Sequence, residues 1–172
     1  MQKKNIFGLR AMAIMLVLGL FLCPALFAEE YISANDLEAA TIKATVTIDG
    51  FSIFATAEKA VNIEAIDEPR TAQDGEIFNA RIKLNGSGKA EYRSVHFTTQ
   101  GIATLTIYTN SSSKTDARIL LLCAVDGTVI GELTAPADSG IAGMATATIP
   151  AAGEYVVYSK SSGINIYQIV VK

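Results

Sequence analysis

Short runs of β-forming residues recur about every 8–12 residues along most of the chain, and this rhythm limits the fold more than any other feature. The runs are rich in Val, Ile, Thr, Tyr and Phe and are separated by Gly, Asn, Asp and Ser. After residue 40 no long segment shows apolar residues at helical spacing. Such a pattern is typical of an all-β sandwich or barrel.

We therefore predict an all-β, jelly-roll-like antiparallel β-sandwich of about ten strands, forming a single domain over residues 29–172. Asp49-Gly50 and Asp126-Gly127 favour hairpin turns. One helical turn, capped by Ser33 or Asn35, fits the segment 31–40. The strands are expected at about 42–48, 51–57, 60–66, 77–84, 91–98, 102–109, 117–125, 128–134, 142–149, 154–160 and 164–171.

The first 28 residues have the parts of a secretory signal peptide. Lys3, Lys4 and Arg10 precede an apolar run, which ends with Pro24 and a small residue at Ala28. A membrane anchor is the alternative, because the apolar stretch reaches the lower limit of roughly 17–25 residues for a bilayer span. The proline and the lack of a following basic stop favour a signal over residues 1–28. A lipoprotein site at Cys23 is disfavoured by the bulky Leu22 before it.

Removal of this signal leaves a chain with no membrane span, secreted to the periplasm or the extracellular space. Without its three cationic residues, 11 basic side chains face 17 acidic ones, a net charge of −6. This charge excludes the basic surface that binds nucleic acids. Cys123 is then the one remaining thiol, so no internal disulfide is expected, and its run ILLLCAV indicates a buried small hydrophobe.

Side-chain alternation predicts a polar, aromatic face on a hairpin formed by residues 91–98 and 102–109. With a turn at 99–101, Tyr92 would lie opposite Tyr108 and His96 opposite Thr104. The same alternation in the last two runs, with a turn at 162–163, sets the following pairs face to face: Tyr158 with Tyr167, and Lys160 with Asn165.

Several segments together resemble a known family. The C-terminal AGEYVVYSKSSGINIYQIVVK resembles the β-sandwich accessory domain attached to secreted bacterial pectate lyases and related polysaccharide-degrading enzymes. The segments ARIKLNGSG, YRSVHFTTQG, TNSSSKTDARILLL and FSIFATAEKAVNIEA extend the resemblance over nearly all of residues 29–172. It implies a jelly-roll-like fold and a carbohydrate-binding role.

Enzymatic chemistry has little support in the sequence. His96 is the one histidine, and no nucleophile adjoins it in sequence. Among 17 acidic residues some carboxylate pair is inevitable, so glycosidase chemistry receives no specific signal. The β-helix repeats of pectate lyases are missing. We expect a non-catalytic protein without a cofactor.

Sugar binding requires aromatic surface together with polar groups in fixed directions. The predicted hairpin faces supply both, and arginines would pair with the carboxylates of a pectic chain. The alternatives are that the tyrosines lie in the core and that Arg93 forms a buried ion pair with Asp116 or Glu91. The candidate residues are Tyr92, Arg93, His96, Tyr108, Arg118, Tyr158, Lys160, Asn165 and Tyr167, with Arg81 as a further cation.

Calcium, bound in a structural role, is the one metal ion for which the sequence offers candidate ligands. Asp116 and Asp126 lie in predicted turns and are weak candidate ligands, as are Asp49, Asp74 and Asp138. Aspartates in turns more often cap the local backbone.

Three functions are therefore considered. The first is a secreted module that binds plant or microbial polysaccharide, pectic glycans included, and holds an enzyme or envelope partner near it. The second is a structural or protein-interaction domain of the envelope. The third and least favoured is a small lyase of the pectate-lyase type.

Overall fold

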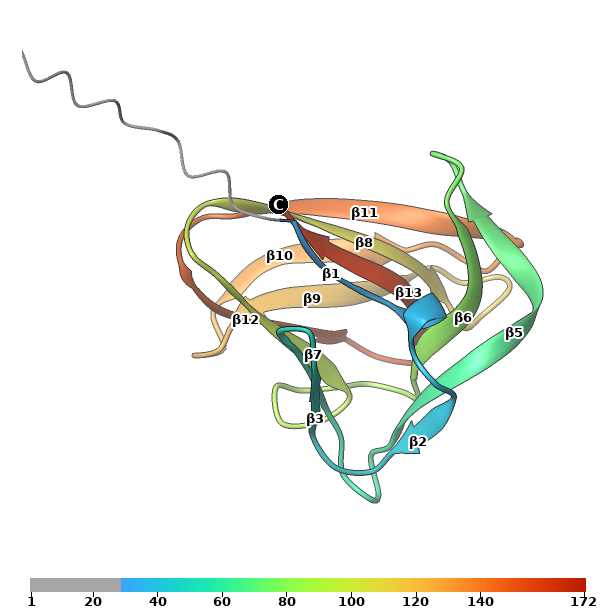
Figure 1. Cartoon of the computed structure of the whole chain (residues 1–172), viewed down its shortest axis with the longest axis horizontal. Helices are drawn as coiled ribbons and strands as arrows, with labels where there is room; N and C mark the ends of the chain where they lie inside the picture. The colour runs from blue at the N-terminus through green and yellow to red at the C-terminus, as the bar shows by residue number, and fades with distance from the viewer. Residues whose placement is uncertain (1–28) are drawn as a thin grey trace, which may run out of the picture.

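The computed structural model describes residues 29–172, which form two β-sheets packed face to face (Figure 1). The first sheet has the order β1-β13-β6-β5-β11-β8, with β2 paired to β5, and the second has the order β10-β9-β12-β7-β4-β3. The predicted β-sandwich is confirmed. The strands are β1 (Glu30–Ser33), β2 (Ala40–Ile42), β3 (Val46–Ile48), β4 (Phe51–Phe54), β5 (Val61–Ala72), β6 (Ile77–Leu84), β7 (Ser94–Thr99), β8 (Ala103–Ser111), β9 (Arg118–Ala124), β10 (Val129–Ala135), β11 (Ile141–Ile149), β12 (Gly153–Ser159) and β13 (Ile164–Val171).

The turns predicted from Asp-Gly pairs are confirmed. Asp49 and Gly50 adopt positive φ angles between the paired strands β3 and β4, and Gly127 does so between β9 and β10. The expected helical turn is a short 3₁₀ helix, η1 (Ala34–Asp36), with Ser33 as its N-cap. The strand β1 directly before it was not predicted.

Residues 1–28 lie outside the described part of the chain, and so do the predicted signal peptide and Cys23. Within residues 29–172 no helix has the length and apolar character of a membrane span.

The main core fills the space between the two sheets. Alternate residues of each strand point into it, as the sequence pattern predicts. Phe97 on β7 contacts the rings of Phe51 and Tyr155 at centroid distances of 6.0 and 6.1 Å. Burial of these apolar faces is the main force that holds the two sheets together.

The predicted hairpin between residues 91–98 and 102–109 is wrong. β7 pairs with β4 and β12 in one sheet, whereas β8 pairs with β11 and β13 in the other. The connection around Gly101 therefore crosses between the sheets, and Tyr92 does not lie opposite Tyr108. The apolar faces of the two strands meet across the core, an arrangement that alternation alone does not distinguish from a hairpin.

The predicted pairing of the last two strands is wrong for the same reason. β12 pairs with β7 and β9, and β13 pairs with β1, β6 and β8. Tyr158 consequently lies opposite Ser94 and Leu121, and Asn165 lies opposite Lys83 and Asn110.

The first sheet curls on itself because β13 pairs with both β6 and β8. Hydrogen bonding then runs around five strands, β13, β6, β5, β11 and β8. A second apolar cluster lies on the face of this sheet turned away from the main core, and it contains Ala72, Phe78, Tyr108, Ala142, Tyr167 and Val170. Arg70 of β5 donates two hydrogen bonds to the carboxylate of Asp138, at 2.9 and 3.0 Å.

Candidate functional site

Three loops meet at one end of the sandwich, and glycines allow them to approach closely. The loops are residues 85–93, 112–117 and 160–163. A β-carbon at Gly88 would lie 2.9 Å from Cβ of Tyr158, just before the loop 160–163, and one at Gly163 would lie 2.6 Å from Oγ of Ser112. The glycines of NGSG (residues 85–88) and SSG (residues 161–163) therefore allow close contact with neighbouring segments, besides forming turns. We call this region the loop-end site, made of Asn85, Arg93, Ser112, Arg118, Gly163 and Asn165.

Arg93 is the most unusual residue of the loop-end site. It directly precedes β7 and has a φ of +50°, which is uncommon for a residue other than glycine. Its Nε atom is buried and has no hydrogen-bond partner among residues 29–172. Strained backbone of this kind clusters at binding and active sites.

The ion pair predicted for Arg93 is absent within the described residues, where neither Asp116 nor Glu91 bridges to it. Arg93 also lies outside β7, which begins at Ser94 and not at residue 91 as predicted. The prediction failed because it extended the strand by three residues.

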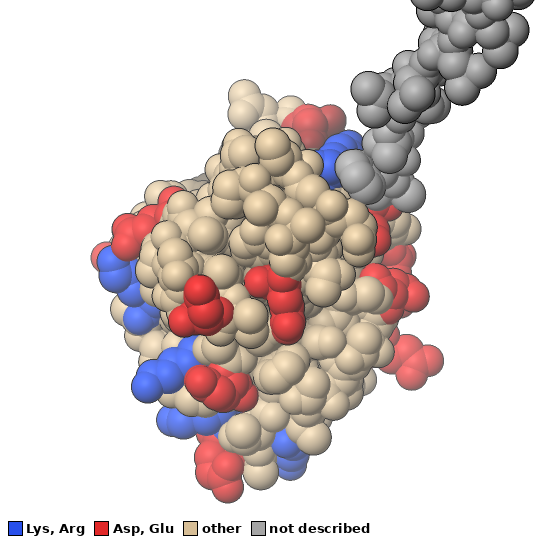
Figure 2. Space-filling model, turned by 90° about the vertical axis from the view of Figure 1, so that its left-hand side faces the viewer, with Lys and Arg blue, Asp and Glu red and all other residues tan. Residues whose placement is uncertain are grey.

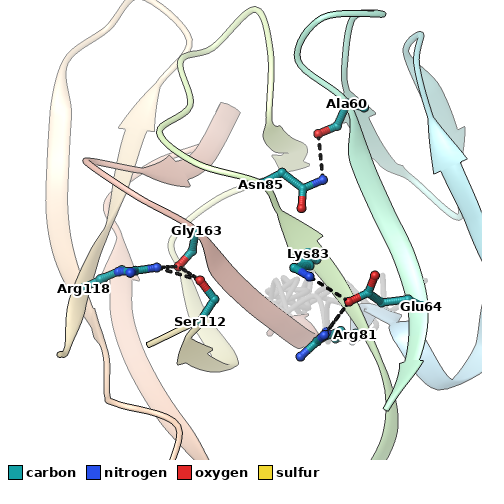
Figure 3. A network of polar contacts seen from close by, with 8 residues as sticks. All are labelled: Ala60, Glu64, Arg81, Lys83, Asn85, Ser112, Arg118 and Gly163. Atoms are coloured by element: carbon teal, nitrogen blue, oxygen red, sulfur yellow. Dashed lines mark hydrogen bonds and ion pairs between the residues drawn. The ribbon is translucent and has the colours of Figure 1, made fainter. Parts of the chain in front are cut away.

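Arg118 borders the site from the start of β9. Its Nη1 atom donates to Oγ of Ser112 at 2.7 Å and to the carbonyl oxygen of Gly163 (Figure 3). These bonds tie the loop 112–117 to the loop 160–163 and hold the guanidinium in one orientation.

Asn165 is the second residue of β13 and lies between Lys83 of β6 and Asn110 of β8. Its side chain is buried, with 1% of the residue exposed, and neither Oδ1 nor Nδ2 has a partner in the described chain. Oδ1 of Asn110 is also unpartnered. Buried polar atoms are nearly always hydrogen-bonded, so this row of amides has unused capacity for water or a ligand.

A charged row continues from Asn165 across the sheet. Oε1 of Glu64 accepts from Nε of Arg81 at 2.8 Å and from Nζ of Lys83 at 3.2 Å (Figure 3). Burial opposes ionisation of Glu64, but these hydrogen bonds and charges outweigh it, so the pKa is lowered. Two cations, Arg81 and Lys83, thus share one carboxylate here, although the chain as a whole is acidic.

The charge of the surface is uneven elsewhere. Figure 2 shows basic side chains among acidic ones along the left and lower margin of one face, and further acidic side chains at its centre and right margin. That face carries no continuous field of either sign, so it offers no extended surface for a charged polymer.

Besides Asn165, three residues predicted for sugar contact are buried. His96 stacks on Phe54 at 4.0 Å, and its Nε2 lies 2.8 Å from the carbonyl oxygen of Ala90. Tyr108 and Tyr167 both pack against Phe78 in the second apolar cluster, at 5.1 and 5.4 Å. Tyr108 and Tyr167 therefore lie in the core, which was the alternative to sugar contact for the tyrosines.

Three other predicted residues, Tyr92, Tyr158 and Lys160, are at least partly accessible but do not contact one another. Tyr92 lies in the loop 85–93, with Nζ of Lys59 at 5.9 Å from its ring centroid. Lys160 pairs with Glu132 at 2.6 Å. Tyr158 contacts Sγ of Cys123 at 3.5 Å, and this hydrogen bond together with burial raises the pKa of Tyr158 to about 12. Cys123 is buried, as predicted.

The weak calcium candidates lie apart from each other and cap their own turns. Asp116 accepts hydrogen bonds from the hydroxyls of Ser113 and Thr115, and Asp126 accepts one from the backbone of Thr128. Within residues 29–172 no three His, Cys, Asp or Glu side chains gather in the manner of a metal site.

Sequence reasoning missed several polar residues of this end of the molecule, namely Asn85, Lys83, Asn110 and Ser112. The signal for them was indirect. Glycines at 86, 88 and 163 were interpreted as turn formers, and their crowding against the neighbouring loops emerges only from the fold.

No family model matches the sequence, and no curated protein matches it. Solved structures do resemble the fold. A protein from work on glycan recognition by the Ruminococcus flavefaciens cellulosome has a TM-score of 0.52 at 15% identity, covering 84% of this chain and 92% of that one. A family 35 carbohydrate-binding module of Clostridium thermocellum has a TM-score of 0.47 at 12% identity, covering 84% and 97%. The CsCBM6-3 module of Clostridium stercorarium, in complex with cellobiose, has 0.41 at 14%, covering 83% and 92%. The first of these likenesses establishes a shared β-sandwich fold.

Proposed function

We propose that this protein is a secreted, non-catalytic module that binds polysaccharide through the loop-end site, with acidic glycans of the pectic type as its ligands. The observation that carries the proposal is the unused hydrogen-bonding capacity of Arg93 and Asn165, which adjoin one loop cluster. A ligand with hydroxyl and carboxylate groups matches that capacity.

The polar groups of the loop-end site suit the hydroxyls of a sugar chain. Asn165 presents both an amide donor and an amide acceptor, the combination that a sugar hydroxyl requires. Arg118 is held by Ser112 and Gly163, so little side-chain entropy is lost when a ligand contacts it. The likeness to the Ruminococcus protein in fold supports the same general role.

The preference for acidic glycans rests on local charge. The chain is acidic overall and repels a polyanion at long range. Among the predicted cations, Lys160 pairs with Glu132 and Arg81 pairs with Glu64, which leaves Arg93 with free capacity. Its guanidinium suits a uronate carboxylate in geometry and charge.

The non-catalytic part of the proposal follows from the side chains of the site. Its named residues contain amides, a hydroxyl, two arginines and a glycine, and none is a carboxylate or an imidazole placed for general acid–base work. Incubation with polygalacturonate is therefore expected to release no unsaturated uronate product that absorbs ultraviolet light.

Isothermal titration of residues 29–172 against polygalacturonate, xylan, cellulose and mucin glycans tests the proposal. We expect heat of binding with polygalacturonate, weakened by added salt, and little or none with cellulose. Failure of all four glycans to bind rejects the glycan-binding role. Binding of neutral glycans alone keeps that role and rejects the acidic preference.

A further inference from the structure

The outer edge of β11 is a long, uncharged strand edge without a partner in the described chain. Residues 143–149 pair with β8 along one edge, whereas the contact with β5 on the other covers only Ile141 and Ala142. In Figure 1 β11 runs along the outer margin of its sheet, with β8 on the inner side. Apart from the ladder with β8, no backbone hydrogen bond within residues 29–172 involves residues 143–149.

An unpaired strand edge presents N–H and C=O groups that another strand can pair with, and proteins usually protect such edges. Charged residues, proline, bulges and very short strands are the usual protection. The strand residues 143–149, GMATATI, contain none of these. Thr146 and Thr148 are exposed on one face, and the smaller Ala145 and Ala147 are partly exposed on the other.

The other free edges of the sandwich are protected. β10 carries Glu132 and a register shift between Val129 and Gly131. β1 is four residues long and begins with Glu30, and β3 has only three residues. Among residues 29–172 the β11 edge is therefore the long edge that lacks these devices.

We propose that β11 is a homodimer interface, in which the edge residues 143–149 pair antiparallel with the same residues of a second copy. Two-fold antiparallel pairing of a strand with itself sets the residue on the axis opposite its own copy, which is unfavourable where that residue is charged. Self-pairing of β10 about its central residue would set Glu132 opposite its copy, whereas β11 brings together only uncharged side chains.

Apolar surface beside this edge adds to the interface. A hollow of about 580 Å³ adjoins the start of β11 and is lined only by uncharged residues of β5, β11 and the turn after β5. Ile141 and Met144 at its rim are 60% and 50% exposed. The strand end of the second copy would cover these side chains and remove their apolar area from water.

Sedimentation equilibrium of residues 29–172 over a wide concentration range tests the proposal. The expected result is a reversible dimer, lost in Thr146→Lys, because the added charges lie together near the two-fold axis. Thr104→Lys is the matched control: Thr104 is exposed and lies opposite Thr148 on β8, away from the edge, so this variant stays dimeric.

Hydrogen exchange provides an independent readout. In the wild type the amides of residues 143–149 are expected to exchange more slowly as protein concentration rises, whereas in Thr146→Lys they exchange at a rate independent of concentration. A wild type that stays monomeric at all concentrations, or a dimer that survives Thr146→Lys with unchanged exchange at β11, overturns the proposal.

Discussion

Arg93 lies directly against Gly86, so that a β-carbon at Gly86 would stand 2.7 Å from Nη1 of Arg93. Gly86 also has a φ of +134°, a conformation that side chains other than hydrogen rarely allow. The guanidinium of Arg93 in the loop-end site therefore packs against the backbone of Gly86.

The variant Gly86→Ala is expected to weaken polygalacturonate binding, because the added methyl group displaces the guanidinium of Arg93. Stability falls as well, by about 1 kcal/mol or more, from backbone strain at positive φ. Affinity electrophoresis and thermal unfolding measure the two effects. Gly127→Ala is the control, since Gly127 has a φ of +90° with no atom near its β-position and lies in a different turn. Equal affinity of the two variants would contradict this role of Gly86.

Removal of the guanidinium itself is expected to have a larger effect on binding than on folding. Hydrogen bonds to charged groups contribute about 1.5–3 kcal/mol, so Arg93→Ala should weaken polygalacturonate binding about tenfold or more. The loss should shrink at high salt. Lys160→Ala is the matched control, because Lys160 is an exposed cation paired with Glu132. If titration calorimetry gives both variants the affinity of the wild type, Arg93 is not a ligand contact.

The ion pair of Arg70 and Asp138 predicts how stability depends on acid. The hydrogen bonds from Arg70 lower the pKa of Asp138 below its ordinary value. The stabilisation is therefore present above the ordinary carboxyl pKa and is lost as pH falls through the lowered pKa of the folded state.

Asp138→Asn is accordingly expected to lower the free energy of unfolding by roughly 3 kcal/mol at neutral pH, because it leaves a mostly buried arginine unpaired. The difference from the wild type should shrink at acid pH below the ordinary carboxyl pKa. Urea unfolding at several pH values measures this difference in the free energy of unfolding. The matched control is Asp126→Asn, which changes an exposed turn cap. A difference that stays constant down to the lowest pH would contradict the assignment.

Buried tyrosines predict how stability depends on alkali. Burial, and for Tyr108 also the hydrogen bond to Asp74, raises the pKa of Tyr108 and Tyr167 to about 12. The fold favours the neutral phenol, so this stabilisation is complete below about pH 10 and is lost as pH rises towards 12. Phenolate absorbance in the ultraviolet should show both tyrosines ionising late, together with unfolding.

Tyr167→Phe keeps the packing against Phe78 and removes one late-titrating phenol. Its affinity for polygalacturonate should equal that of the wild type, because the ring lies in the second apolar cluster. A marked loss of affinity in Tyr167→Phe would restore Tyr167 as a ligand contact and contradict its assignment to the core.

The positions of most strands were predictable because alternation and turn residues are local signals. The strand expected at 77–84 matches β6, and Asp49-Gly50 marks the β3–β4 hairpin. Pairing was not predictable from the same signals. A strand with one apolar face fits equally well beside a neighbour or across the core from it, so β7 with β8 was misassigned to one sheet.

The candidate site was predictable only in part. Arg93, Arg118 and Asn165 were identified from residue type, because cations and amides suit acidic sugars. Their convergence depends on loops that the sequence does not place, and on close contacts at Gly86 and Gly163. Tyr108 and Tyr167 are buried because the first sheet curls and encloses a second apolar face, a feature that no local pattern reveals.

The most direct test is a titration of ¹⁵N-labelled residues 29–172 with an oligogalacturonate, followed by amide chemical shifts. We predict that the shift changes concentrate at the loop-end site and include the side-chain signals of Arg93 Nε and Asn165 Nδ2. Few changes are expected on β9 and β10 beyond Arg118. Shifts that concentrate elsewhere on the molecule, or none at saturating ligand, would contradict the assignment of this site.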